Sequence, residues 1–282
     1  MATISTVTQS AKRVANVPLR TLDSFGDQMS FYIRAFAWVP RALRRYIKEI
    51  LRLLAEVSFG SGALAVIGGT VGVMVGLTVF TGVLVGLQGF TALNSIGTAA
   101  FTGFITAYFN TREIAPLVAG LALSATVGSG FTAQLGAMRI SEEIDALEVM
   151  GIPSLPYLVT TRVIAGFVAI IPLYVLGLLA SYVASRFITV YFEGQSAGTY
   201  DHYFNLFLPP EDVYYSFGKV LIFSLIVIML HCYYGYRASG GPAGVGVAVG
   251  KAVRTVIVSI NVLDLFLSLA IWGTTTTVRI AG

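Results

Sequence analysis

The residues of this sequence that could take part in chemistry are charges in apolar surroundings, and the densest group of them is acidic. Glu142, Glu143, Asp145 and Glu148 fall within seven positions, whereas the 282-residue chain contains only 14 acidic residues. Carboxylates at this density can pair with the Arg and Lys side chains of a partner protein. Because almost purely apolar segments flank them, we expect a short polar element between two buried ones.

Three further charges lie beside or inside apolar segments. Arg112 and Glu113 precede the uncharged residues 114–138, and Asp264 lies within another apolar segment. Charges inside a membrane are rare and often functional. Arg112 and Glu113 fit a substrate cavity and a structural anchor equally well. For Asp264, a buried polar partner or a neutral carboxyl is favoured over a role in transport, although we keep it as a third candidate for the cavity.

Enzyme chemistry finds no support in the sequence. There is no Ser/His/Asp set, carboxylate dyad or Cys/His cluster, and His202 and His231 are too scattered to predict a metal site. A phosphate-binding P-loop requires Gly-Lys followed by Ser or Thr, but Gly250-Lys251 is followed by Ala252. We therefore expect this chain to bind no metal or cofactor and to hydrolyse no ATP.

The composition predicts an all-α integral membrane protein. The chain is 56% hydrophobic and 11% charged, and the 55 residues from Val57 to Thr111 contain no charge. A membrane-spanning helix needs about 20 apolar residues. Residues 88–97 are predicted as a turn, and 96–109 as a re-entrant or outer-leaflet helix too short to cross. The predicted spans are 62–88, 112–137, 160–188, 215–236 and 254–277.

An interfacial amphipathic helix is predicted over 41–55, after an N-terminal cytoplasmic or interfacial segment at 1–40. Its apolar residues follow one helical face, and its cations follow the other. We favour contact with anionic lipid headgroups over packing on a soluble partner or binding of nucleic acid, because a span begins a few residues later. The residues predicted at the membrane surface are Arg41, Arg44, Arg45, Lys48 and Arg52.

Loop charge predicts the orientation. Nine of the 18 basic residues lie in the first 52 positions, and Arg139 and Arg162 bracket the acidic segment. Residues 187–218 contain no Lys or Arg. By the positive-inside rule, the N-terminus, the acidic segment and the Gly-rich loop at 237–254 are cytoplasmic, while the loop at 190–214 and the C-terminus are outside.

The acidic segment is predicted to form a short docking helix over 141–151. Ser141 is a suitable N-cap, Gly151 a suitable C-terminal residue, and Pro153 prevents continuation. The alternative is a helix lying on the bilayer with its acids in water, but the cytoplasmic leaflet repels acids. A soluble partner is expected to contact Ser141, Glu142, Glu143, Asp145, Leu147, Glu148, Met150 and Gly151.

The sequence also resembles the MlaE/YrbE permease family, in particular its actinobacterial YrbE branch and the B-type paralogue of that branch. The matching motifs are R-E-x-A-P at 112–116, the small residues at 128–130, L-G-x-M-R at 135–139, E-x-I-D-A-L-E-V-M-G at 142–151, C-Y-Y-G-Y at 232–236, S-G-G-x-x-G-V-G at 239–246 and V-L-D at 262–264. The resemblance covers about 40–280 and implies that 41–282 is a permease domain.

The family resemblance implies a membrane subunit of an ABC-type lipid transporter in the inner (plasma) membrane. It implies that the acidic helix is a coupling helix inserted into an ATPase subunit, which binds ATP and Mg. It also implies a second permease subunit, identical or paralogous, and MCE proteins on the outer side. Two alternatives remain: a secondary transporter driven by protons through Asp264 and Glu113, and a membrane scaffold that transports nothing.

Overall fold

Five helical segments are long and apolar enough to cross a bilayer. The computed structural model describes residues 25–59 and 69–273, so Gly68 and the predicted start of the first span lie outside the described residues. For the part of the chain that is described, the prediction of an all-α membrane protein with five spans is confirmed. The five segments are Thr70–Asn94, Ala99–Ile140, Leu155–Phe192, Pro210–Tyr236 and Gly241–Trp272.

Two of these segments contain turns of other helix types. In the order of the chain, the elements that form and connect the spans are α5 (Thr70–Asn94), the 3-10 turn η1 (Ala99–Phe101), α6 (Thr102–Phe109), the π turn η2 (Asn110–Ile114), α7 (Ala115–Leu123), the π turn η3 (Ser124–Gly128), α8 (Ser129–Ile140), α9 (Glu143–Val149), the π turn η4 (Leu155–Thr160), α10 (Thr161–Phe187), the π turn η5 (Ile188–Phe192), α11 (Ala197–Leu206), α12 (Pro210–Tyr236) and α13 (Gly241–Trp272).

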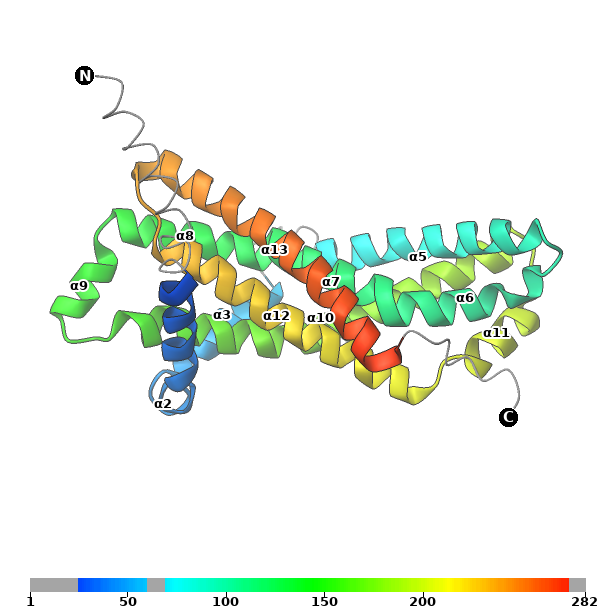
Figure 1. The fold of residues 1–282 in the computed structure, drawn as a ribbon, viewed down its shortest axis with the longest axis horizontal. Coiled ribbons are helices and arrows are strands. Elements are labelled where there is room, and N and C mark those ends of the chain that lie inside the picture. Colours follow the sequence, from blue (N-terminus) through cyan, green and yellow to red (C-terminus); the bar gives the residue numbers. More distant parts are fainter. Residues whose placement is uncertain (1–24, 60–68, 274–282) are drawn as a thin grey trace, which may run out of the picture.

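The long helices run along the longest axis of the molecule (Figure 1). The short helix α9 lies at one end of this axis, which we call the α9 end, and α11 lies at the other, the α11 end. The connection between α12 and α13 is also at the α9 end. The predicted topology, in which the acidic segment and the connection after 236 share one side, agrees with this arrangement.

The second segment differs most from its predicted form. Residues 96–109 do not form a separate re-entrant helix, because Ala99–Ile140 is helical over 42 residues. At 1.5 Å per residue this segment is about 63 Å long, twice the thickness of the hydrocarbon core. Pro116, in the first turn of α7, does not interrupt this segment, which continues from the π turn η2 into α7 and α8. Arg112 and Glu113 therefore lie inside a continuous helix.

Two predicted loops contain helices. The Gly-rich loop at 237–254 is short, because α13 begins at Gly241 and includes the glycines that follow. Its small residues allow close packing on α8, and a Cβ at Gly136 would lie 2.9 Å from Val245 Cγ1. The predicted outer loop at 190–214 contains α11, which packs on α6 through Gly103. The backbone in both regions is hydrogen-bonded within a helix.

Glycines in α5 face α10 at close range. A Cβ at Gly82 would lie 2.5 Å from the Ser181 carbonyl oxygen, and one at Gly86 would lie 2.9 Å from the Ser185 carbonyl oxygen. Ser185 Oγ donates a hydrogen bond of 2.8 Å to the Gly82 carbonyl. These glycines therefore form the contact of α5 with α10, since small residues let helices approach closely in lipid.

We expect Gly82→Leu to destabilise the protein by about 1–3 kcal/mol, because the side chain would force α5 away from the backbone of α10. Thermal unfolding in detergent measures the effect. Gly76→Ala is the matched control on the same helix, because a Cβ there meets nothing within 4 Å. Equal losses of stability in the two variants would contradict the proposed role of the close contact.

Candidate functional site

Five charged side chains from three helices meet in the half of the bundle nearer the α11 end. The π turn η2 contributes Arg112 and Glu113, α12 contributes Asp212 and Lys219, and α13 contributes Asp264. We call these five residues the charged cluster. The structure thus brings together the three residues predicted for a substrate cavity, and it adds two that the sequence analysis did not select.

Lys219 is the centre of the charged cluster. Its side chain is completely buried, and its Nζ lies 2.6 Å from Asp264 Oδ1 and 3.2 Å from Glu113 Oε2. The same Nζ donates to the Arg112 carbonyl at 2.7 Å and to Ser268 Oγ at 2.8 Å. Ser268 in turn donates to Glu113 Oε1 at 2.8 Å. The buried partner expected for Asp264 is therefore Lys219, and Glu113 shares it.

Arg112 and Asp212 form a second buried pair. Arg112 Nε donates to Asp212 Oδ2 at 2.7 Å, and Trp272 Nε1 donates to the other carboxylate oxygen at 2.9 Å. The guanidinium carbon lies 4.0 Å from the centre of the Tyr108 ring and 5.0 Å from that of Trp272. Ionic and cation–π contacts together fix the position of this cation.

The π turn explains how two adjacent residues of η2 can both reach this cluster. A π turn widens the helix and leaves backbone groups to be satisfied from outside. Ser216 Oγ donates to the Thr111 carbonyl at 2.5 Å, and Asn110 donates to Ser185 at 3.0 Å. Polar side chains from α12 and α10 thus stabilise the turn that presents Arg112 and Glu113.

The charged cluster contains three carboxylates and two cations. Arg112, Asp212, Lys219 and Asp264 are each at least nine-tenths buried, whereas the Glu113 side chain is 32% exposed. Removing one partner from a buried ion pair leaves an uncompensated charge at a high cost in free energy. The cluster therefore holds η2, α12 and α13 together as long as every charge keeps its partner.

A cavity of about 580 Å³ adjoins the Arg112–Asp212 pair. Aromatic residues make up much of its wall, and Arg112 Nη1 has no hydrogen-bond partner among the described residues. The cavity thus combines aromatic side chains with fixed charged groups, and polar groups in fixed positions orient a ligand in small-molecule sites. Its lining includes Phe104, Tyr108, Arg112, Phe207, Asp212 and Trp272.

At the other end of the molecule, α9 is a two-turn helix with a defined start and stop. Its last turn ends in a Schellman motif, in which Gly151 N–H donates to Glu148 O at 3.0 Å and Ile152 N–H donates to Leu147 O at 2.9 Å. Gly151 has a φ of 74°, as predicted for its position. This part of the docking-helix prediction agrees with the structure.

The predicted N-cap is wrong. Ser141 ends α8, and its hydroxyl donates to the Ala137 carbonyl and to Glu143 Oε1, not to the backbone N–H groups of α9. The residue before α9 is Glu142, which has a φ of 59° and makes no side-chain cap. Ser141 and Glu142 are adjacent, but a tight turn places Ser141 at the end of α8 and Glu142 directly before α9. This turn is not visible in the sequence, which therefore could not show which of the two residues precedes α9.

Glu142 and Gly151 both have left-handed backbone angles, so substitutions at these two residues test the effect of backbone strain on stability. A non-glycine residue in this conformation costs roughly 1–2 kcal/mol. We expect Glu142→Gly to leave the melting temperature unchanged or to raise it, and Gly151→Ala to lower it. A Cβ at Gly151 meets no atom within 4 Å, so only backbone strain would act there. Calorimetry in detergent should find a loss of stability in Gly151→Ala but none in Glu142→Gly. A loss in Glu142→Gly would mean that its carboxylate has a structural partner.

Three of the four acids of α9 have partners within the chain. Asp145 accepts a bond of 2.7 Å from Arg139, and Glu143 accepts one of 2.9 Å from Ser141. Glu148 accepts a bond of 2.6 Å from Ser154, whose hydroxyl also lies 2.7 Å from the Tyr236 hydroxyl. Through this last chain of contacts α9 reaches the end of α12.

The apolar surface of α9 is divided between the chain's own core and the outside. Ile144 is fully buried, whereas Leu147 is partly buried and packs against the same core, so only part of Leu147 is open to a partner. Val149 and Met150 are 90% and 66% exposed. The surface available to a partner is therefore Val149 and Met150 beside the exposed carboxylates.

The predicted interfacial helix is two helices, α2 (Val39–Arg45) and α3 (Ile47–Phe59), separated at Tyr46. Residues 25–37 form a further helix, which we call the N-terminal helix. The N-terminal helix and α2 run across the long axis of the bundle (Figure 1). Of the five predicted surface cations all are exposed, but Arg52 is paired with Glu49 and Glu56. Arg41, Arg44, Arg45 and Lys48 have no such ion pair among the described residues.

At the α11 end, Arg186 pairs with Asp201 of α11. Arg186 Nε lies 2.7 Å from Asp201 Oδ1, and this hydrogen-bonded cation lowers the pKa of the Asp201 carboxyl below its usual value. Because both side chains are more than 40% exposed, solvent screens the pair and its contribution to stability is small. It fixes α11 against the end of the third span.

Sequence reasoning missed Lys219, Asp212, Ser268 and Trp272. Lys219 had a usable signal, because it is the only charge between Asp212 and Arg237 and a lone Lys within a span is costly without a partner. Asp212 looked like part of an acidic outer loop, and nothing in the sequence links Trp272 to it. Only the packing of three distant helices brings these residues together.

Comparisons with known proteins agree with this architecture. The sequence model of the family described as Permease MlaE matches residues 59–270. A probable ABC transporter permease protein of Rickettsia felis is 30% identical over 243 residues, which cover 85% of this chain and 90% of that protein. A probable ABC transporter permease protein of Rickettsia bellii is 28% identical, with 86% and 90% covered. Protein TRIGALACTOSYLDIACYLGLYCEROL 1, chloroplastic, of Arabidopsis thaliana is 28% identical over 199 residues, 71% of this chain and 57% of that protein.

Proposed function

Because the chain belongs to the MlaE permease family, we propose that it is the membrane subunit of an ATP-driven lipid transporter. The observation that supports this most directly is α9. It lies at one end of the spans, short and well bounded, with Val149 and Met150 exposed beside carboxylates. An apolar patch with charges at its rim suits insertion into a groove of a soluble protein. The partner is an ATPase subunit, which binds ATP and Mg.

The proposed substrate is a hydrophobic lipid such as a fatty acid, a phospholipid or a sterol. The cavity beside Arg112 supports this class, because it combines aromatic walls with a buried cation. The name of the Arabidopsis relative contains that of a lipid, trigalactosyldiacylglycerol. In this proposal the lipid chain contacts the aromatic wall and a polar headgroup contacts Arg112.

The proposed mechanism uses two connections between α9 and the charged cluster. One is covalent, because α9 follows directly on the helical segment Ala99–Ile140, which contains Arg112 and Glu113. The other passes from Glu148 through Ser154 to Tyr236 at the end of α12, the helix of Asp212 and Lys219. When ATP closes the ATPases, α9 moves, the two helices shift relative to each other, and the cavity changes its opening.

The assembly that we propose contains a second permease subunit, identical or paralogous, and MCE proteins at the α11 end. In this proposal the spans cross the plasma membrane and the α9 end faces the cytoplasm. The N-terminus lies on the cytoplasmic side as well. Exposed cations of α2 and α3 at this end support the orientation, since cytoplasmic loops are enriched in Lys and Arg. The C-terminus is then outside.

Purification of the full chain from its native membranes in mild detergent tests this proposal. Mass spectrometry of the purified material should find an ATPase subunit with a P-loop, a second permease and an MCE protein. Reconstituted into vesicles, the complex should move a fluorescent lipid only when ATP and Mg are supplied. Purified chain without any ATPase, or lipid movement that does not depend on ATP, would refute the proposal.

A further inference from the structure

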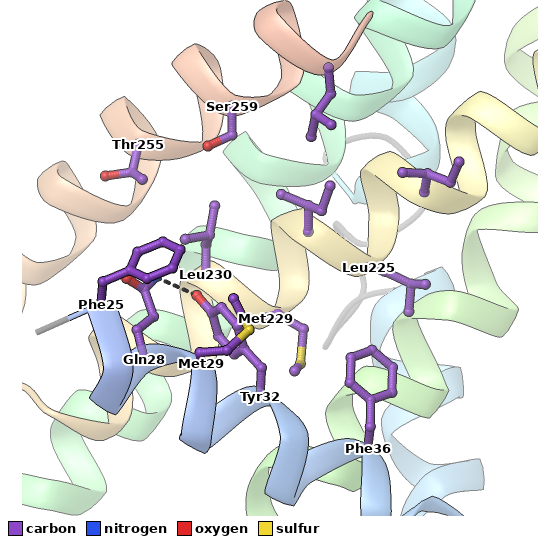
Figure 2. Close-up of a pocket in the computed structure, with 13 residues that line it drawn as sticks. Phe25, Gln28, Met29, Tyr32, Phe36, Leu225, Met229, Leu230, Thr255 and Ser259 are labelled. Atoms are coloured by element: carbon purple, nitrogen blue, oxygen red, sulfur yellow. Dashed lines mark hydrogen bonds between the residues drawn. The ribbon is translucent and has the colours of Figure 1, made fainter. Parts of the chain in front are cut away.

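An apolar groove of about 520 Å³ lies between the N-terminal helix, α12 and α13, and its lining includes none of the residues predicted for a site. Each helix contributes one stripe to it. Phe25, Met29, Tyr32 and Phe36 follow a single face of the N-terminal helix, and Thr255, Ser259 and Leu263 follow a single face of α13. Figure 2 shows these stripes and the side chains of α12 around one space.

The N-terminal helix packs against α12 and is hydrogen-bonded to the third span, so it can form one wall of the groove. Phe31 is 3% exposed and packs edge-on against Tyr233 of α12, with 5.5 Å between the ring centres. Thr160 donates a hydrogen bond of 3.0 Å to the Ala35 carbonyl. The opposite face of this helix remains open, since Phe25 is 61% and Met29 42% exposed. The groove is therefore a built feature of the fold, with large apolar side chains left uncovered.

Two polar side chains of the groove are hydrogen-bonded within the chain. Gln28 Nε2 donates to the Tyr32 hydroxyl at 2.5 Å, and Thr255 Oγ1 donates to the Lys251 carbonyl at 2.9 Å. The α12 residues of the groove, such as Ile226 and Met229, lie within a membrane-spanning helix. There the surrounding solvent is hydrocarbon, so the groove offers its occupant mainly apolar contact.

One end of the groove adjoins positive charge. Thr255, at this end, follows Arg254 directly and Lys251 by one helical turn, and both cations are exposed. Neither cation forms an ion pair among the described residues. These residues belong to the first half of α13, which begins at the α9 end (Figure 1). Because the predicted span begins at residue 254, we expect both cations near the lipid headgroups of that leaflet.

We infer that this groove binds one acyl chain of an anionic phospholipid from the leaflet at the α9 end, with Lys251 and Arg254 facing its headgroup. The site is separate from the cavity beside Arg112, because the two share no lining residue. The bound lipid ties the N-terminal helix to α12 and α13, which contain three residues of the charged cluster. The inference holds whether or not the chain transports lipid, and its test measures binding alone.

The test uses a phosphatidylglycerol probe with a diazirine in its acyl chain, added to the complex in phosphatidylcholine nanodiscs. After illumination, mass spectrometry locates the probe on the chain. Labelling is expected to concentrate on peptides that contain Met29 and Met229, and to exceed that of the matching phosphatidylcholine probe. Lys251→Gln and Arg254→Gln should each reduce this preference about fivefold, as expected for one cation near a membrane surface.

Two variants fill the groove from different walls, Ile226→Trp on α12 and Leu263→Trp on α13. Each should lower the labelling at least fivefold, and thermal unfolding identifies any variant that fails to fold. Val258→Trp is the control, because Val258 is 63% exposed on α13 and does not line the groove. Labelling spread evenly over the lipid-facing helices, or unchanged in both groove variants, would overturn the inference. So would cross-links from Met29 to a second copy or to residues 1–24.

Discussion

Lys219→Met is expected to have the largest effect on stability of any single substitution in this protein. The ammonium group is fully buried and lies between Asp264 and Glu113. Methionine has a similar shape but no charge, so two carboxylates would remain near each other without their cation. Breaking a buried ion pair in this way costs about 3–5 kcal/mol. We expect a correspondingly lower melting temperature in detergent and at least a tenfold loss of lipid transport.

A second substitution separates charge from packing. In Lys219→Met with Asp264→Asn, the more deeply buried carboxylate is also neutral, and Glu113 is sufficiently exposed to be solvated. Much of the lost stability should therefore return. Lys48→Met, at an exposed cation of α3 that has no ion pair among the described residues, is the control and should change stability little. If the double variant unfolds at the same temperature as Lys219→Met, the ion pair is not what stabilises the three helices.

Val149→Glu combined with Met150→Glu should give the largest effect on activity with little effect on stability. Both side chains are mostly exposed, so charge there costs the isolated chain almost nothing. In a complex, the two carboxylates would enter the apolar groove proposed for the ATPase, where desolvation of an unpaired charge is costly. We expect co-purification of the ATPase and ATP-dependent lipid movement to fall at least tenfold.

Ile144→Ala is the matched comparison for this prediction. Ile144 belongs to the same helix but is fully buried against the chain's own core. Its truncation should lower stability by about 2–5 kcal/mol and leave ATPase binding by the folded fraction unchanged. The docking interpretation of α9 fails if the exposed double variant still binds the ATPase with wild-type affinity.

The sequence predicts those parts of the fold that follow from local composition. Long uncharged segments require helices in a bilayer, because no other backbone structure satisfies its hydrogen bonds there. The same rule explains why the Gly-rich residues after Gly241 are helical although their composition is typical of a loop in soluble proteins. Glycine is common in membrane helices, where it allows close packing.

The sequence indicated three of the charges in the functional site but not their arrangement. Arg112, Glu113 and Asp264 stand out because charge within apolar segments is costly without compensation. Which cation meets Asp264 depends on the packing of α12 against α13, and Lys219 and Asp264 are 45 positions apart. Which apolar side chains of α9 are buried and which are exposed likewise depends on the helices that pack against α9. No local sequence pattern identifies those helices.

The π turn η2 determines how far α6, before it, is rotated about the helix axis relative to α7, after it. One additional residue in a helical turn rotates everything beyond it by about 100° relative to an uninterrupted α-helix. A single-codon deletion within Asn110–Ile114 would thus turn the aromatic residues of α6 away from the cavity while leaving α7 and α8 in place. In evolution, such an insertion or deletion changes in one step which side chains α6 contributes to the cavity, and it leaves α9 and its connection to α8 unaltered.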